Sequence, residues 1–487
     1  MKKCPKCGME NSNNNKYCEK CGEVLIDEKN KTSKGKPLPI VGIAIAAVLI
    51  IGGVFLLTRK TGTGSKEPQE SVAVAATEPV EQESGTTPAT TESTSEAVSE
   101  TTKDEVSPEE KEKESPWGDE VLEAKMREIT QNYSENFGPE DVMDLTELDL
   151  SSTGPRSESI HNISALAKLI NLKKLNISGN DVGDISALSS LTELETLDLS
   201  GTHIKDISAL SKCRELKVLY LHGNEIKDIS VLSELTKLEK IYLDHNPITD
   251  YSALKYLKNL DFLHVENNSL TDINMLTGLT ELRCLYMDSN QINDISVLSE
   301  LKNLETLSLR TNQISDISSL SELRELKEIR LSDNQIKDIS ALSDLTELET
   351  VNLNYNQVSD ISALSNATRL KWLNLENNQI TDISGLSGLT NLYNLELNNN
   401  QVSDISALSD ATSLEWLNLN NNQITDISGL SGLTKLTILR LQNNPIEDIS
   451  PLYELTNLQT LNLKGTDVPK EQIDAFREAV PDCEVSW

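Results

Sequence analysis

The sequence predicts an α/β solenoid in which short repeats stack into one parallel β-sheet, with short 3-10 helices or turns on the convex side. Three observations support this fold. A 22-residue unit recurs fourteen times without insertion between residues 162 and 469. Leucine returns at fixed positions of that unit. Only 4% of the 487 residues are aromatic, which is few for a set of conventional globular cores.

Each unit follows the pattern D-I-S-x-L-s-x-L-t-x-L-x-x-L-x-L-x-x-N-x-I-x, counted from position one at the aspartate. This pattern is a leucine-rich repeat. Leucines at positions five, eight, eleven, fourteen and sixteen, with Ile or Val at position twenty-one, are expected to form the core. A strand is expected at positions fourteen to sixteen, as in Leu307-Ser308-Leu309. The units begin at Asn162, Asp184, Asp206, Asp228, Asp250, Asp272, Asp294, Asp316, Asp338, Asp360, Asp382, Asp404, Asp426 and Asp448.

Side chains at two polar positions of the unit are predicted to form hydrogen bonds with backbone groups. Position nineteen is Asn in twelve of the fourteen units, with Thr202 and Thr466 in the other two, and its side chain can pair with backbone groups where the chain leaves the strand. The opening Asp of thirteen units is expected to cap the convex turn. A calcium-binding ladder is the alternative, but one carboxylate per turn provides fewer oxygens than calcium prefers.

The N-terminal residues 1–25 predict a zinc ribbon. Cys4, Cys7, Cys18 and Cys21 form two CxxC pairs, each followed by glycine, and four thiolates suit one tetrahedral, structural zinc ion. The alternative is a pair of disulfides in a secreted mini-domain. A segment this small has almost no core, so zinc binding would supply most of its folding energy.

A membrane segment is predicted next. Residues 26–37 are basic, and residues 38–57 (LPIVGIAIAAVLIIGGVFLL) carry no charge. Twenty apolar residues span a bilayer core of about 30 Å as one helix. The flanking lysines and the reduced cysteines favour a cytoplasmic N-terminus and an extracellular repeat domain, and hence a single-pass protein of the cell membrane. Residues 58–115, rich in Ser, Thr, Glu and Pro, predict a disordered acidic linker.

The D-I-S-x-L repeat and its flanks resemble the internalin-type bacterial surface proteins. Residues 116–161, with Trp117 and Asp119, are similar to the helical N-terminal cap of that family, and residues 470–487 resemble a C-terminal cap. An insertion of about five residues is expected around 154–159, between the N-terminal cap and the repeats. The chain departs from the family in lacking a cleavable leader and a wall-sorting signal, so the N-terminal helix is expected to be the anchor.

The charge distribution argues against nucleic acid as a partner. The chain has a formal charge of −33, although residues 1–60 carry 11 basic and 5 acidic side chains. The remainder is therefore strongly acidic, whereas phosphate binding draws its affinity from clusters of Lys and Arg.

Positions thirteen, fifteen and seventeen are expected to form the concave binding face. Units three to six place aromatic and charged residues there, and exposed aromatic residues beside charges are typical of interface anchors. A second patch in later units could suit a carbohydrate or a peptide. The alternative is that aromatic residues simply tolerate sheet surfaces. The candidate residues are Tyr220, His222, Tyr242, Asp244, Phe262, His264, Glu266, Tyr286 and Asp288 in the first patch, and Trp372, Glu376 and Trp416 in the second.

The remaining reactive side chains suggest no catalytic site. The five histidines occupy different positions of their units, which disfavours a metal cluster. Cys213 replaces a core leucine, and neither Cys213, Cys284 nor Cys483 has a His partner at nucleophile spacing. We therefore expect no enzymatic activity.

The sequence thus predicts a membrane-anchored surface protein whose leucine-rich repeats bind a protein or a glycan. A second hypothesis is a transmembrane signalling or scaffold protein whose zinc ribbon contacts a cytosolic partner. A third is a repeat domain facing the cytosol, similar to leucine-rich regulatory subunits of protein phosphatases.

Overall fold

The computed structural model describes residues 2–3, 10–11, 115–154 and 158–487, in two compact units, Met1–Lys103 and Asp104–Trp487. In the first unit, β1 (Lys2–Lys3) pairs antiparallel with β2 (Glu10–Asn11). The four ribbon cysteines, the predicted membrane segment and residues 58–114 of the predicted linker lie outside the described residues. Among the helices of the described ranges, none is both long and apolar enough to cross a bilayer.

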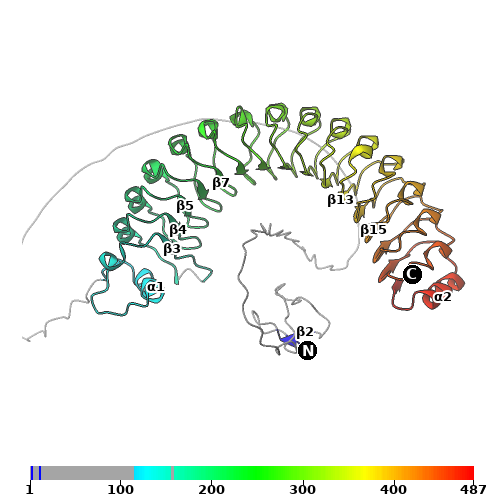
Figure 1. The fold of residues 1–487 in the computed structure, drawn as a ribbon, viewed down its shortest axis with the longest axis horizontal. Helices are drawn as coiled ribbons and strands as arrows, with labels where there is room; N and C mark the ends of the chain where they lie inside the picture. The colour runs from blue at the N-terminus through cyan, green and yellow to red at the C-terminus, as the bar shows by residue number, and fades with distance from the viewer. Residues whose placement is uncertain (1, 4–9, 12–114, 155–157) are drawn as a thin grey trace, which may run out of the picture. The chain divides into compact units, whose positions relative to one another are not determined.

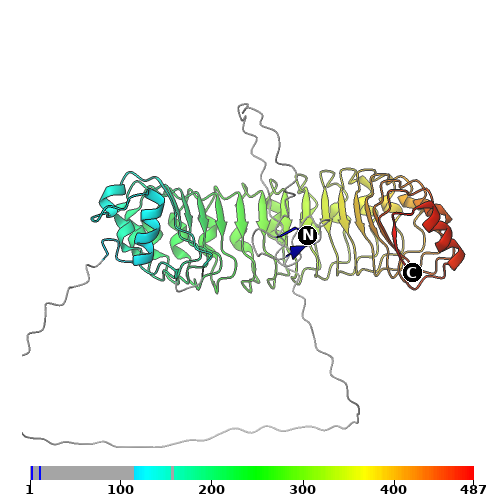
Figure 2. The same cartoon turned by 90° about the horizontal axis from the view of Figure 1, so that it is seen from below.

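One sheet of sixteen parallel strands runs through the second unit in sequence order, which confirms the predicted solenoid. The strands line the inner side of the arc, and the 3-10 helices lie on the outer side (Figure 1). Seen from below, the strands lie side by side (Figure 2). The strands are β3 (Glu147–Asp149), β4 (Lys174–Asn176), β5 (Thr196–Asp198), β6 (Val218–Tyr220), β7 (Lys240–Tyr242), β8 (Phe262–His264), β9 (Cys284–Tyr286), β10 (Thr306–Ser308), β11 (Glu328–Arg330), β12 (Thr350–Asn352), β13 (Trp372–Asn374), β14 (Asn394–Glu396), β15 (Trp416–Asn418), β16 (Ile438–Arg440), β17 (Thr460–Asn462) and β18 (Glu484–Ser486).

Each of the strands β4 to β17 occupies positions thirteen to fifteen of its unit, one residue earlier than the sequence analysis expected. Leu307 pairs with Ile329, 22 residues later in the chain. Leu309, at position sixteen, still donates its N–H to the carbonyl of Arg330 at 2.8 Å. The chain is already leaving the strand there, because Thr311 at position eighteen has a left-handed φ of 54°.

Short 3-10 helices form the convex side, and the opening aspartates cap them as predicted. In a typical unit, Oδ1 of Asp294 accepts the N–H of Ser296 at 2.9 Å. Asn162 makes the same bond to Ser164 at 2.9 Å, so an amide can replace the carboxylate. The helices are η4 (Ser164–Lys168), η5 (Ser186–Ser190), η6 (Ser208–Lys212), η7 (Ser230–Glu234), η8 (Ser252–Tyr256), η9 (Asn274–Leu276), η10 (Ser296–Glu300), η11 (Ser318–Leu320), η12 (Ser340–Leu342), η13 (Ser362–Asn366), η14 (Ser384–Leu386), η15 (Ser406–Leu408), η16 (Ser428–Leu430) and η17 (Ser450–Leu452).

The core runs continuously between the sheet and the convex helices. The six predicted positions are buried, and the isoleucine at position two, which was not expected there, joins them. Cys213 takes the place of a core leucine and is fully buried, as predicted. No unit can bury this apolar surface alone, so stacking supplies the stability. In the unit that begins at Asp294 the core residues are Ile295, Leu298, Leu301, Leu304, Leu307, Leu309 and Ile314.

The asparagines at position nineteen join successive units, which confirms their predicted role. The Nδ2 group of Asn334 donates to the carbonyl of Leu331 in its own unit at 3.1 Å and to that of Leu309 in the preceding unit at 2.9 Å. Its Oδ1 accepts the N–H of Ile314 at 2.9 Å. Thr202 reproduces only the bond within its own unit, to the carbonyl of Leu199 at 2.6 Å.

A helix covers each end of the core. The N-terminal helix α1 (Glu120–Thr130) is capped by Asp119, which accepts the N–H of Leu122 at 2.9 Å, and the short 3-10 helix η2 (Pro139–Val142) follows it. The C-terminal helix α2 (Lys470–Ala479) buries Ile473 and Phe476. These helices keep the last apolar edges of the array out of water.

The five-residue insertion predicted before the first repeat is confirmed. Leu148 of β3 pairs with Leu175 of β4, 27 residues later. The turn after β4 requires Gly179, whose φ is +71°, because an added Cβ would lie 2.0 Å from the carbonyl oxygen of Ser152. The register between β3 and β4 is kept across the insertion, since Glu147, Leu148 and Asp149 pair with Lys174, Leu175 and Asn176.

Candidate ligand-binding face

Four adjacent strands, β6 to β9, bring five predicted rings into contact on the concave face. Tyr220 and Tyr242 are stacked with centroids 4.5 Å apart. Phe262 lies 4.7 Å from Tyr242 and 5.5 Å from Tyr286. Because neighbouring parallel strands are in register, side chains at positions thirteen and fifteen stand beside one another on the face opposite the core. We call Tyr220, Tyr242, Phe262, His264 and Tyr286 the aromatic cluster.

His264 lies in the middle of this cluster, between two carboxylates. Its ring meets Tyr242 edge-on at 5.9 Å and Tyr286 at 5.6 Å. Its Nδ1 is 3.4 Å from Oδ1 of Asp244, and its Nε2 is 2.9 Å from Oε1 of Glu266. Oδ1 of Asp244 is buried and accepts no hydrogen bond from the described residues. The imidazole is therefore the positive contact of both carboxylates when it is protonated.

The surroundings shift the ionisation of these groups. Burial alone would lower the pKa of His264, but the hydrogen bond with Glu266 and the negative charges of Asp244, Glu266 and Asp288 outweigh it and raise that pKa. Burial would raise the pKa of Glu266, yet the hydrogen bond and charge of His264 lower it. Burial also raises the pKa of Tyr286 to about 12, so its hydroxyl stays protonated.

Asp288 differs from the exposed rim residue that the sequence analysis predicted. Its side chain is buried, with 3% of the residue exposed. Oδ1 accepts hydrogen bonds from the hydroxyl of Ser308 at 2.6 Å and from the backbone N–H of Arg310 at 2.8 Å. Nε of Arg310 donates to Oδ2 at 2.5 Å. Asp288 is thus bound by Ser308 and Arg310, and Asp244 and Glu266 are the two acidic groups that contact His264.

His222 lies at the edge of the first patch. Its Nδ1 is 2.9 Å from the hydroxyl of Ser200 in the preceding unit. Among the described residues it makes no ring contact with the aromatic cluster. It therefore borders the cluster without belonging to it.

The second predicted patch is less continuous than the first. Trp372 lies on β13 and Trp416 on β15, with β14 between them. The indole N–H of Trp416 donates to Glu396 on β14, and the guanidinium of Arg440 lies 4.7 Å above its ring. Glu376 accepts a hydrogen bond from the amide of Asn377 at 2.9 Å. Of the two neighbours that hold Trp416, Glu396 belongs to the predicted patch, whereas Arg440 was not identified from the sequence.

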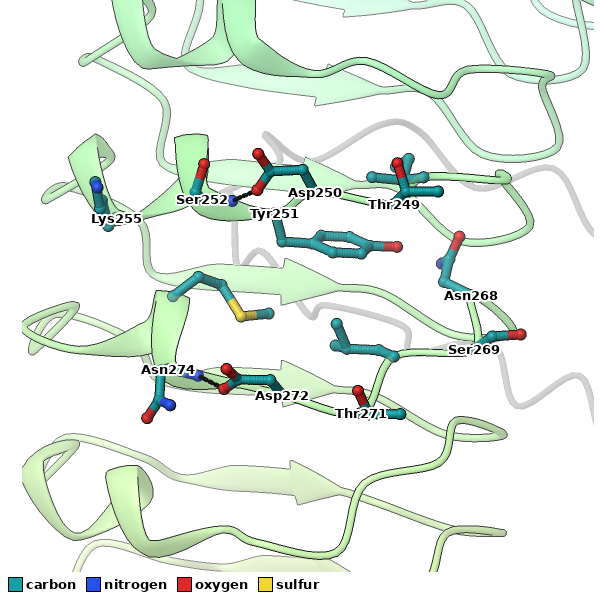
Figure 3. A pocket seen from close by; sticks show the side chains of 13 residues that line it. Thr249, Asp250, Tyr251, Ser252, Lys255, Asn268, Ser269, Thr271, Asp272 and Asn274 are labelled. Carbon is teal, nitrogen blue, oxygen red and sulfur yellow. Dashed lines mark hydrogen bonds between the residues drawn. The ribbon is translucent and has the colours of Figure 1, made fainter.

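A pocket of about 570 Å³ lies outside the concave face, between units five and six. The sequence analysis did not predict it. Tyr251 stands where the other units have isoleucine at position two, and its ring lies between the two units (Figure 3). Its hydroxyl is buried and has no hydrogen-bond partner among the described residues. The change from D-I-S to D-Y-S was the signal available in the sequence.

The remaining histidines and cysteines of the described ranges are not assembled into a site. In the part of the chain that the structure describes, no three His, Cys, Asp or Glu side chains are placed to hold a metal ion. Burial raises the pKa of the Cys213 thiol to about 11. Cys284 and Cys483 are also free thiols.

Comparison with known families identifies the repeats. The matching family, leucine-rich repeats (2 copies), describes two successive repeats at a time. It matches several stretches of the chain, and together these cover more than half of it. The chain belongs to the leucine-rich repeat family. The matched windows are residues 170–212, 192–235, 214–256, 236–280, 258–300, 280–322, 324–366, 368–410 and 412–454.

Among solved structures, this leucine-rich repeat protein is similar to an internalin. An internalin (inlF) from Listeria monocytogenes is 34% identical with a TM-score of 0.62, over 71% of this chain and 95% of that one. A leucine-rich repeat protein of Leptospira interrogans is 26% identical with a TM-score of 0.61, over 72% and 97%. The Arabidopsis receptor kinase HAESA, 24% identical with a TM-score of 0.57 over 66% and 58%, shares the fold.

The N-terminal segment matches a second family. Residues 3–25 match a zinc-ribbon domain, and they contain the four cysteines predicted to bind zinc. No curated protein matches this chain significantly.

Proposed function

We propose that this leucine-rich repeat protein recognises another protein through its concave face, with the aromatic cluster as the main contact. The observation that carries the proposal is the continuous contact of five rings across β6 to β9. These rings lie on the opposite face of the sheet from the core, so they are not part of the buried core that the repeats share. Aromatic side chains beside charged groups are common anchors of protein interfaces.

The same proposal places the repeat domain outside a cell. The apolar segment 38–57 and its basic N-terminal flank support a single membrane helix with a cytoplasmic N-terminus. The similarity to an internalin supports a role at the cell surface. The match to a zinc-ribbon domain supports one structural zinc ion held by Cys4, Cys7, Cys18 and Cys21.

Replacing Tyr220, Tyr242 and Tyr286 together with alanine tests the binding site. The matched control replaces Tyr256, Tyr355 and Tyr393, which are 51%, 50% and 44% exposed and lie outside the cluster. Surface proteins captured by the full-length wild type should be lost by the first variant and retained by the control. Retention by both variants at unchanged melting temperature would overturn the site assignment.

A second candidate function is recognition of a cytosolic partner by the zinc ribbon, which the family match at residues 3–25 favours. It predicts a partner retained by residues 1–36 alone and lost when zinc is chelated. Protease treatment of intact cells separates the two placements of the repeats. Release of peptides from residues 117–487 supports an exterior repeat domain, and cleavage only after lysis supports the cytosolic alternative, similar to phosphatase regulators.

A further inference from the structure

We propose that the aromatic cluster receives a basic side chain, a lysine or an arginine, of the protein partner, and that Asp244 and Glu266 bind its charge. This inference rests on the proposed function and names the chemical class of the group recognised. His264, which lies between the two carboxylates, occupies the position of that cation in the unbound protein.

The first argument is that two carboxylates, Asp244 and Glu266, share a single ion-pair partner in the described part of the chain. Among the described residues, Asp244 and Glu266 form their ion pairs with His264 alone, and no Lys or Arg contacts either of them. Asp288, by contrast, is paired with Arg310. The buried Oδ1 of Asp244 accepts no hydrogen bond from the described residues, and such an oxygen is costly to leave unpaired. A ligand cation can supply the missing donor after His264 moves or loses its proton.

The second argument comes from the rings beside the carboxylates. The faces of tyrosine and phenylalanine rings attract cations, by roughly 0.5–2 kcal/mol depending on desolvation. The long apolar stems of Lys and Arg also pack well on aromatic surfaces. Tyr242 contacts Tyr220, Phe262 and His264 at once, so the rings form one continuous surface on which such a stem can pack beside the carboxylates. A neutral or acidic side chain would gain the apolar contact but would meet the two carboxylates unfavourably.

The third argument is competition between the ligand cation and the proton of His264. The groups facing this imidazole are Asp244 and Tyr242 from β7 and its following turn, Glu266 after its own strand, and Asp288 and Tyr286 from the β9 side. Beyond them, Arg310 and His245 add positive charge near Glu266. A protonated His264 already neutralises part of the carboxylate charge. Binding of a basic side chain should therefore strengthen as His264 loses its proton and should lower the pKa of His264.

The test uses an oligolysine peptide and its Nε-acetylated form with the full-length protein. Acetylation removes the charge and keeps the apolar stem. Because much of the chain is acidic, oligolysine will also bind elsewhere on the protein. The affinity for oligolysine is therefore compared between a variant of this site and a control variant. Asp244→Asn with Glu266→Gln should weaken the binding at this site by at least about tenfold. The control variant, Glu193→Gln with Glu325→Gln, removes two exposed charges outside the concave face. It should leave the binding of oligolysine at this site unchanged.

A second readout is independent of whether the Asp244 and Glu266 variant folds. In protein labelled with ¹³C-histidine, oligolysine should shift the titration of His264 to lower pH, and the acetylated peptide should not. His264→Gln identifies the signal and should bind oligolysine with less pH dependence than wild type. An unmoved His264 titration, or equal effects of both peptides, would overturn the cationic ligand. If the tyrosine variant still loses its partner in that case, the proposed function stands and only the ligand class is wrong.

Discussion

Nδ1 of His264 lies 3.4 Å from Oδ1 of Asp244, and this carboxylate oxygen is buried without a hydrogen-bond donor among the described residues. The two groups come from successive strands, one unit apart. A protonated imidazole makes this arrangement favourable, whereas a neutral one removes the positive charge that pairs with both Asp244 and Glu266. The stability of the array should therefore respond to the protonation of a single residue on its concave face.

The first prediction is a pH-dependent stability that His264→Gln removes. The folded pKa of His264 is raised above the ordinary value of 6.5. Its contribution is therefore fully present below pH 6.5 and is lost as the pH rises through the raised folded pKa. Thermal unfolding of wild type and variant from acidic to alkaline pH checks this. The advantage of wild type should shrink with rising pH, and an advantage that grows would show that the sign is wrong.

The second prediction concerns the asparagines that join the units. Asn334→Ala should destabilise the array by about 1–3 kcal/mol, because the N–H of Ile314 loses its acceptor. The carbonyls of Leu309 and Leu331 each lose one donor but keep a second, from Asn312 and Asn356. Asn334→Thr should cost less, because Thr202 shows that a hydroxyl can keep the bond within its own unit. Chemical denaturation measures both. Equal losses for the two variants would contradict this account of the bonds.

The third prediction concerns the convex caps. The N–H of Ser340 and its hydroxyl donate to Asp338 and lower the pKa of that carboxyl. This stabilisation is present above the unfolded pKa of about 4 and is lost as the pH falls through the lower folded value. Asp338→Ala should lower the melting temperature at neutral pH. Asp338→Asn should retain most of the cap, as Asn162 does, and should lose its acid dependence. If both variants melt like wild type, the cap contributes nothing measurable.

Much of this fold could be predicted from the period of the sequence. The repeat fixes which side chains face the core, so the buried leucines, the capping aspartates and the joining asparagines followed from position alone. The strands were placed one residue late, because position sixteen still bonds to the next unit after the strand has ended. The isoleucine at position two was overlooked because the pattern around D-I-S was interpreted only as a turn.

The arrangement of the candidate site was harder to predict. Register alone brings Tyr220 beside Tyr242, and the sequence analysis placed both on the concave face. The burial of Asp288 under Arg310 and the stacking of Arg440 on Trp416 depend on which rotamers long side chains adopt, and a repeat pattern does not specify them. The sequence analysis placed these residues on the concave face but treated every acidic residue among them as exposed.

The fourth prediction concerns the pocket around Tyr251. Its buried hydroxyl has no hydrogen-bond partner in the described ranges, and an unpaired polar group costs about 1–3 kcal/mol. Tyr251→Phe keeps the ring and should stabilise the protein, by about 1 kcal/mol. Tyr256→Phe, on an exposed tyrosine nearby, is the control and should have no effect. A loss of stability in Tyr251→Phe would reveal a partner for the hydroxyl.

The central claim is that the concave aromatic cluster contacts a partner protein outside the cell. The most direct measurement places a photo-crosslinking amino acid at Tyr242 or, as the control, at Tyr256 on the convex helix η8. Full-length protein on intact cells is then irradiated in its native surroundings. The account predicts a covalent partner adduct from position 242 and none from position 256. An adduct from position 256 alone, equal adducts from both, or none from position 242 would contradict it.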